Sequence, residues 1–163
     1  MAWTFKQSSE VKVNREHAWK FWTTVENWLL DSAIVWVKLD GPFQPGAKGT
    51  TMTTTPELVY WEIVSVDVGE GAVIEIPLPG AVARFAWRFE ELPNDCTRLN
   101  QEITLTGDQA ESYAGQMGAG FEQGIRDGMQ KLCTEMERSK EVRYLTAGFI
   151  PGSNAISWKD EMG

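Results

Sequence analysis

The sequence contains few of the residues that hold metal ions or form disulfides. Among its 163 residues are one histidine, His17, and two cysteines, Cys96 and Cys133, which lie far apart and outside any CxxC motif. A zinc or non-haem iron site needs several converging histidine, cysteine or carboxylate ligands. The sequence also lacks a GxSxG motif, a phosphate-binding glycine loop followed by lysine, and a dinucleotide-binding fingerprint. We therefore expect no metal, no cofactor and two reduced thiols.

Long apolar runs and an excess of basic residues are absent too. No apolar run approaches the roughly 18 residues that a membrane-spanning helix needs, so no membrane span is expected. Residues 1–6 lack the basic head and apolar core of a secretory signal, which predicts a cytoplasmic location. The 23 acidic residues outnumber the 15 basic ones and give a formal net charge of −8. Because nucleic-acid binding depends on clustered Lys and Arg, nucleic acid is not an expected partner.

One long helix is predicted over residues 109–138, where apolar side chains recur every three or four positions. They are Tyr113, Met117, Phe121, Ile125, Met129, Leu132 and Met136. The same segment contains five glycines, at positions 115, 118, 120, 124 and 128. Each glycine costs about 0.5–1 kcal/mol relative to alanine in a helix interior. Two interpretations are open: close packing of the helix on a sheet, or room for a ligand between them.

Upstream of this helix the sequence alternates between strand and turn patterns. A first strand is predicted from Trp3 to Val13, followed by a short helix that begins after Asn14 and a second one over residues 26–30. Six more strands are predicted at residues 34–40, 48–55, 58–68, 72–76, 82–92 and 96–105, separated by short Gly- and Pro-containing turns. This order predicts an α+β domain over residues 1–140, in which an antiparallel sheet wraps around the long helix.

Residues 141–163 are predicted to form a C-terminal tail. The tail carries Tyr144, Phe149, Ile150 and Trp158, which makes simple disorder less attractive. It could fray, close the mouth of the domain or reach a neighbouring subunit in a homodimer, and these roles stay open.

Several motifs occur in an order that is similar to a known superfamily. They are VKVNREHAW at residues 11–19, Trp28, LDGPF at residues 39–43 with Gly46 and Gly49, Pro79-Gly80, Thr97-Arg98 and Thr106-Gly107. Together they resemble the START-like helix-grip superfamily, also called SRPBCC, and within it the polyketide cyclase/dehydratase-type ligand-binding proteins. The resemblance covers roughly residues 3–138 and implies a curved seven-stranded antiparallel sheet, two short helices after the first strand, and an elongated apolar cavity against the C-terminal helix.

The resemblance also implies a range of functions. Members bind lipids, sterols, polyketides and other hydrophobic molecules, and some catalyse cyclisation or dehydration. Others are carriers or chaperone activators. The leading hypothesis is therefore that the protein binds a small hydrophobic molecule, with metal-independent cyclase or dehydratase chemistry as an open question. The alternatives are a non-catalytic carrier of a lipid or hydrophobic metabolite and an interaction module without a ligand.

Candidate site residues come from polar and aromatic side chains on apolar strand faces. Gln101 is in phase with Leu99, Ile103 and Leu105, so it is predicted to face the cavity. Around Glu62 both faces of the strand are apolar, which leaves the register open. One register pairs Val64 and Val66 with Ile76 and Ile74, and Ile74 with Phe85. It puts Tyr60 and Glu62 on the inner face with Phe85 and Trp87, and it pairs Arg84 with Glu75 on the outer one. The other register leaves Glu62 solvated.

On the first register, Glu62 is a carboxylate in an apolar cavity. Desolvation favours its protonated form and suits it to proton transfer. The predicted catalytic residues are therefore Glu62 and Tyr113. The predicted ligand-binding residues are Tyr60, Gln101, Trp87, Phe85, Met117, Phe121 and Trp36.

Overall fold

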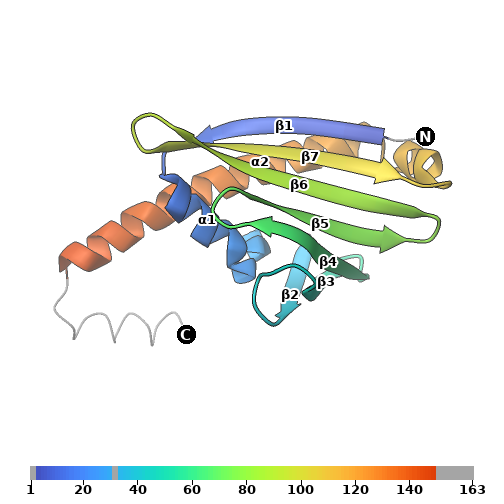
Figure 1. Ribbon diagram of the computed structural model, residues 1–163, viewed down its shortest axis with the longest axis horizontal. Helices are drawn as coiled ribbons and strands as arrows, with labels where there is room; N and C mark the ends of the chain where they lie inside the picture. Colours follow the sequence, from blue (N-terminus) through green and yellow to red (C-terminus); the bar gives the residue numbers. More distant parts are fainter. Residues whose placement is uncertain (1–2, 31–32, 150–163) are drawn as a thin grey trace.

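The protein forms one seven-stranded antiparallel sheet with its helices on one side (Figure 1). The computed structural model describes residues 3–30 and 33–149, and the side chains of all of these except residues 117–119 and 141–149. The strand order is β1-β7-β6-β5-β4-β3-β2. The strands are β1 (Trp3–Val11), β2 (Ile34–Asp40), β3 (Lys48–Thr53), β4 (Leu58–Asp67), β5 (Gly71–Leu78), β6 (Ala81–Leu92) and β7 (Cys96–Thr106). The predicted α+β order and all seven predicted strands are confirmed.

Two short helices follow β1, as the sequence predicts. Helix α1 (Arg15–Thr23) begins after Asn14, whose side-chain oxygen accepts a hydrogen bond from the backbone N–H of His17 at 2.8 Å. The capping bond satisfies one of the free N–H groups of the first turn. The 3₁₀ helix η1 (Val25–Leu30) comes next and contacts β2. Together α1 and η1 turn the chain from one edge of the sheet to the other.

The long helix α2 (Ala110–Phe149) continues past Arg138. The predicted end of this helix near Arg138 is therefore wrong. Residues 139–147 contain neither glycine nor proline, and an i,i+3 ion pair between Arg138 and Glu135 at 3.2 Å supports the helix where the apolar stripe ends. Residues 150–163 of the predicted tail lie outside the described residues. Of the helices in the described part, none is long and apolar enough to cross a membrane.

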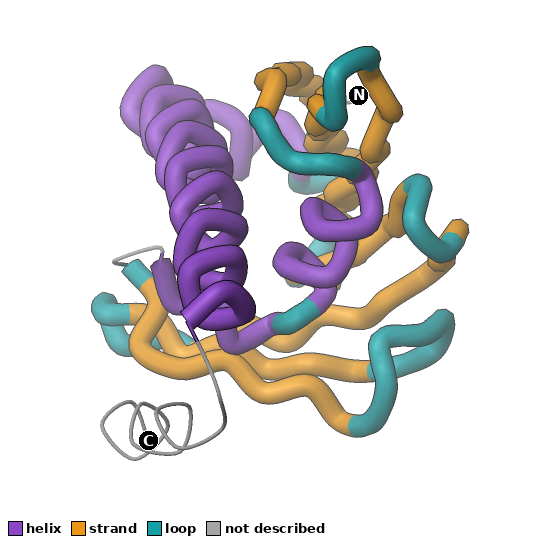
Figure 2. The backbone as a smooth tube through the Cα atoms, turned by 90° about the vertical axis from the view of Figure 1, so that its left-hand side faces the viewer, coloured by secondary structure: helices purple, strands orange, loops and turns teal. Residues whose placement is uncertain are grey.

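The two faces of the sheet differ in what covers them. Helix α2 runs mainly along β1, with fewer contacts to β7, and α1 packs on β6 and β7. Figure 2 shows these helices on the same side of the sheet. We call this side the inner face and the opposite side the outer face. Leu99, Ile103 and Leu105 of β7 are buried on the inner face, which shows that the core lies between the sheet and the helices.

An aromatic cluster fills the inner face beneath α1 and η1. Trp22 of α1 lies at its centre, with ring centroids 5.2 Å from Trp87, 5.4 Å from Phe43 and 5.5 Å from Phe89. Trp28 continues the cluster to Trp61, at 5.1 Å. Offset and edge-to-face contacts of this kind add to the apolar area that each ring buries. The cluster holds the short helices against the sheet.

The glycines of α2 do not mark close packing. At Gly115, Gly120, Gly124 and Gly128 an added Cβ atom would meet nothing within 4 Å outside the helix's own backbone. Of the two interpretations of the glycine-rich segment, close helix-to-sheet packing is therefore wrong at these four positions. The missing side chains leave open space beside the helix.

We expect Gly124→Ala to stabilise the protein. The position is in a helix interior and nothing opposes an added methyl group, so the gain should be about 0.5–1 kcal/mol. For a chain of this length the melting temperature should rise by about 1–4 °C in thermal denaturation followed by circular dichroism. A lower melting temperature would mean that a neighbouring group occupies this space.

Candidate functional site

One row of residues crosses the inner face of the sheet and joins the aromatic cluster at Trp87. Gln7, Gln101, Trp87, Ala72 and Val66 are successive register partners on β1, β7, β6, β5 and β4. Residues two positions further along these strands are apolar: Phe5, Ile103, Phe85 and Ile74. The two glutamines are thus amide groups set in an apolar surface, where each needs hydrogen-bonding partners.

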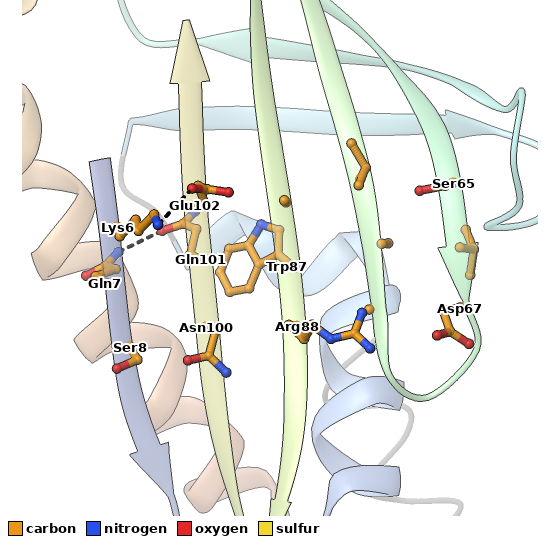
Figure 3. A pocket seen from close by; sticks show the side chains of 15 residues that line it. Lys6, Gln7, Ser8, Ser65, Asp67, Trp87, Arg88, Asn100, Gln101 and Glu102 are labelled. Atoms are coloured by element: carbon orange, nitrogen blue, oxygen red, sulfur yellow. Dashed lines mark hydrogen bonds and ion pairs between the residues drawn. The ribbon is translucent and has the colours of Figure 1, made fainter. Parts of the chain in front are cut away.

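The two glutamines bond to each other and to α2. Gln7 Nε2 donates to Gln101 Oε1 at 2.7 Å and to the backbone oxygen of Ile125 at 3.2 Å. Gln101 is only 8% exposed. The pair links three elements, β1, β7 and α2, at the point where the helix passes over the sheet. Figure 3 shows the bond between the two amides, with Trp87 on the neighbouring strand.

Apolar groups flank this pair on the side away from β1. Trp87 is half-buried, and its ring lies against Trp22 and Phe89. Phe85 and Ile76, further along β6 and β5, are also only half-buried, although both point to the inner face. Helix α2 packs chiefly on β1, so this part of the inner face is not closed by its main contacts. An apolar, partly covered surface of this kind suits a hydrophobic ligand.

The inner-face placements of Gln101, Trp87 and Phe85 are confirmed by the strand register. The predicted pairing of Ile74 with Phe85 is confirmed as well. Arg84 lies opposite Glu75 on the outer face, with an ion pair of 3.1 Å between exposed or half-exposed groups that adds little stability.

The predicted pairing of Val66 with Ile74 is wrong, and with it the inner-face placements of Glu62 and Tyr60. The register shifts between Ile63 and Ser65, so that Ile63 lies opposite Ile74 and Val66 opposite Ala72. This β-bulge changes the phase of alternation along β4 and turns Trp61 and Ile63 inward. Glu62 then lies beside Lys48 and Glu75 on the outer face, and Tyr60 is 60% exposed. A catalytic carboxylate at Glu62 inside the cavity is therefore not supported.

Trp36 is also misplaced by the prediction. It lies opposite Met52 in the stretch where Val37 faces Thr51, so its side chain projects from the outer face, and it is 40% exposed. A register shift between Ile34 and Trp36 accounts for the difference, because it interrupts the alternation at the end of the edge strand β2.

Two of the α2 candidates, Tyr113 and Phe121, contact residues other than Gln101. The hydroxyl of Tyr113 donates to the backbone oxygen of Pro79 at 2.9 Å, in the turn between β5 and β6, and the ring packs near Ala81 and Leu105. This bond gives Tyr113 a structural partner. Phe121 makes an edge-to-face contact with Trp3 at 5.9 Å. The side chain of Met117 lies outside the described residues.

Gln7 is a site residue that the sequence reasoning missed. It is in phase with Phe5 and Val11, both buried on the inner face of β1. That phase was a usable signal, but only the pairing of β1 with β7 shows that Gln7 meets Gln101. Among the described residues no group of three or more His, Cys, Asp or Glu could hold a metal. Burial, with a smaller contribution from Glu137, raises the pKa of Cys133 to about 11, so its thiol is unreactive near neutral pH.

A shallow groove of about 620 Å³ crosses the outer face of the same five strands. Its lining includes side chains that alternate with the inner row, such as Ser8, Asn100, Arg88 and Asp67, and an ion pair between Lys6 and Glu102 at 3.3 Å (Figure 3). The lining also includes the five residues of the inner row, but no described residue of α1 or α2. The groove therefore lies on the other side of the sheet from the helices. It is therefore distinct from the apolar inner surface.

The fold defined by these elements is the helix-grip fold, and comparison with solved structures agrees. The Zhui aromatase/cyclase from Streptomyces sp. R1128 superposes with a TM-score of 0.69 at 13% identity, covering 85% of this chain and 95% of that one. Truncated norcoclaurine synthase from Thalictrum flavum gives 0.63 at 11% identity, covering 81% and 93%. Ara h 8.0201 gives 0.64 at 15% identity, covering 85% and 97%. The TM-scores establish a shared fold, and at such low identities they establish the fold alone.

No family model matches the sequence, and no curated protein matches it. The START-like resemblance is thus confirmed at the level of architecture. The function has to be argued from the residues of the inner face.

Proposed function

We propose that the protein binds a small, uncharged, hydrophobic molecule between α2 and the inner face of β5, β6 and β7. The observation that carries this proposal is the half-buried apolar surface of Phe85, Trp87 and Ile76 beside the Gln7–Gln101 pair. Half-buried aromatic rings that point to the core side of a sheet favour a flat aromatic or polyketide-like ligand. Two of the solved structures with this fold are, by name, an aromatase/cyclase and a norcoclaurine synthase, which is compatible with such a ligand.

The charges of the inner face favour binding over acid–base catalysis. Among the described strand residues that face inward, the only ionisable one is Glu91, which is exposed near the end of β6 opposite Thr97. Arg126 of α2 lies over the ring of Phe5 at 5.0 Å, and its side chain is 53% exposed. Acid–base catalysis needs a positioned proton donor or acceptor in the site. A non-catalytic carrier or binding protein fits this inner face better than a cyclase or dehydratase.

The absence of inward carboxylates and lysines near Gln101, among the residues described, also argues for an uncharged ligand. A charged group transferred into an apolar site without a partner loses several kcal/mol of hydration. The aromatic and aliphatic side chains around Trp87 and Phe85 offer no such compensation, and the guanidinium of Arg126 lies over the ring of Phe5 instead.

The first test is native mass spectrometry of the purified protein, followed by denaturing extraction of any bound molecule. Titration with N-phenyl-1-naphthylamine, an uncharged aromatic probe, gives a second and independent measurement. We expect saturable binding of one probe molecule with quenching of tryptophan fluorescence, because Trp87 lines the proposed site. The proposal fails when the protein carries no ligand and shows no saturable binding of the probe.

We expect Phe85→Ala to weaken probe binding by about 5- to 30-fold. The substitution removes a half-buried ring on the inner face, and an aromatic contact with its buried area is worth about 1–2 kcal/mol. Tyr60→Ala is the matched control, since it removes an aromatic ring that is 60% exposed on the outer face, and it should leave the dissociation constant unchanged. Equal effects of the two substitutions would contradict an inner-face site.

A further inference from the structure

We infer that the side-chain amide of Gln101 is the group that selects the ligand, and that it selects for a carbonyl or other hydrogen-bond acceptor oxygen. This inference rests on the proposed function and names the polar feature that the bound molecule must have. It follows from the order in which the hydrogen bonds of the Gln7–Gln101 pair are fixed.

The backbone oxygen of Ile125 fixes the orientation of Gln7. A carbonyl oxygen only accepts hydrogen bonds, so the Gln7 atom 3.2 Å away must be the amide nitrogen. The reverse orientation of Gln7 would place two oxygens against each other. The contact with α2 therefore settles which end of the Gln7 amide is which, independently of Gln101.

Gln7 in turn fixes the orientation of Gln101. The same Gln7 nitrogen lies 2.7 Å from Gln101, so the Gln101 atom that faces it must be the acceptor, Oε1. With Oε1 held toward β1, the amide nitrogen lies on the other side of the group. In the part of the chain that the structure describes, this nitrogen has no hydrogen-bond partner.

The free amide nitrogen is next to open space. Gln101 is more than nine-tenths buried. Among the described residues, every side-chain nitrogen or oxygen that is fully buried has a hydrogen-bond partner. The amide nitrogen of Gln101 must therefore contact space that a water molecule can enter. Trp87, the register partner of Gln101, and Phe85, two positions away on β6, are half-buried on the same face of the sheet.

These facts define the ligand chemistry. Two N–H groups with fixed direction face an otherwise apolar surface, so they favour a ligand that presents an acceptor oxygen. A pure hydrocarbon would strip water from the amide and leave it unpaired, which costs affinity. An ammonium group would meet a donor and be repelled. A flat, uncharged molecule with a carbonyl on its edge satisfies the amide and the aromatic rings together.

The test compares two ligands of nearly the same shape in competition with N-phenyl-1-naphthylamine. 2-Acetylnaphthalene carries a carbonyl oxygen, and 2-isopropylnaphthalene does not. For each protein we divide the dissociation constant of the hydrocarbon by that of the ketone. We expect this ratio to be about 5- to 10-fold larger in the wild-type protein than in Gln101→Met. Methionine keeps the length and volume of glutamine without its amide, so the fold should be retained, which near-ultraviolet circular dichroism checks.

Gln7→Met provides the second variant. It removes the donor that orients Gln101 and leaves the Gln101 amide in place, so the ratio should fall by a smaller factor than in Gln101→Met. 2-Naphthoate, a carboxylate of similar shape, should compete less well than the ketone in the wild type. Tighter binding of the naphthoate would overturn the assignment of an uncharged ligand.

The outcomes separate the inference from the function on which it rests. Saturable probe binding with no preference for the ketone, or a preference that survives in Gln101→Met, overturns the role of Gln101 and leaves the binding function standing. No saturable binding of any probe in the wild type overturns the proposed function, and the inference falls with it.

Discussion

Trp22→Ala should cost about 3–5 kcal/mol in the free energy of unfolding, the range for removing a buried tryptophan from a packed core. The side chain is 3% exposed, and its ring contacts those of Trp19, Trp28, Phe43, Trp87 and Phe89. These rings belong to α1, η1, the β2–β3 loop and β6, so the substitution loosens the attachment of both short helices to the sheet. The loss should appear as a lower midpoint in urea denaturation.

Trp36→Ala is the matched control for this substitution. The residue type is the same, but Trp36 is 40% exposed on the outer face, where substitutions cost less. We expect about 1 kcal/mol or less. A loss for Trp36→Ala as large as that for Trp22→Ala would contradict the assignment of the inner and outer faces at this end of the sheet.

Much of the fold could be predicted from the sequence because its signals are local. Glycine and proline turns separate the strands, and the side chain of Asn14 caps the first helix by accepting a hydrogen bond from the backbone N–H of His17 in its first turn. Alternation along β7 puts Gln101 on the buried face, since Leu99, Ile103 and Leu105 share its phase. The pairing of β5 with β6 follows from a two-residue turn and is confirmed at Ile74 and Phe85.

The site was harder to predict because it depends on two features without a local signal. A bulge between Ile63 and Ser65 reverses the phase of β4, and the apolar residues on both faces of that strand give no hint of it. Likewise, nothing in the first strand indicates that Gln7 meets both Gln101 and the backbone of Ile125, residues more than ninety positions away in the chain. Both features are decided by how strands that are distant in the sequence pair with one another.

The two registers of β4 differ in whether the side chain of Trp61 has room on the inner face. On the observed register Trp61 lies opposite Gly49 of β3, and its indole ring occupies the space above that glycine. The ring is fixed there by a hydrogen bond of 3.0 Å from its Nε1 to the hydroxyl of Thr51 and by contact with Trp28. A residue without a side chain at position 49 thus allows β4 to turn its tryptophan inward and Glu62 outward.

Gly49→Ala should therefore destabilise the protein by about 2–3 kcal/mol, in contrast to the stabilising Gly124→Ala. An added Cβ would overlap the Cζ2, Cε2 and Cη2 atoms of Trp61, which is 4% exposed and has no free space to enter. Overpacking of this kind forces side chains from their rotamers or shifts the backbone.

The cause can be isolated by repeating the substitution in a Trp61→Leu background, which removes the overlapping ring atoms at a cost of its own. There Gly49→Ala should cost less than about 1 kcal/mol, so the coupling between the two positions, measured by urea denaturation in a double-mutant cycle, should be about 1–2 kcal/mol. If Gly49→Ala costs the same in both backgrounds, the glycine is required by the backbone of β3, and the inward turn of β4 needs another explanation.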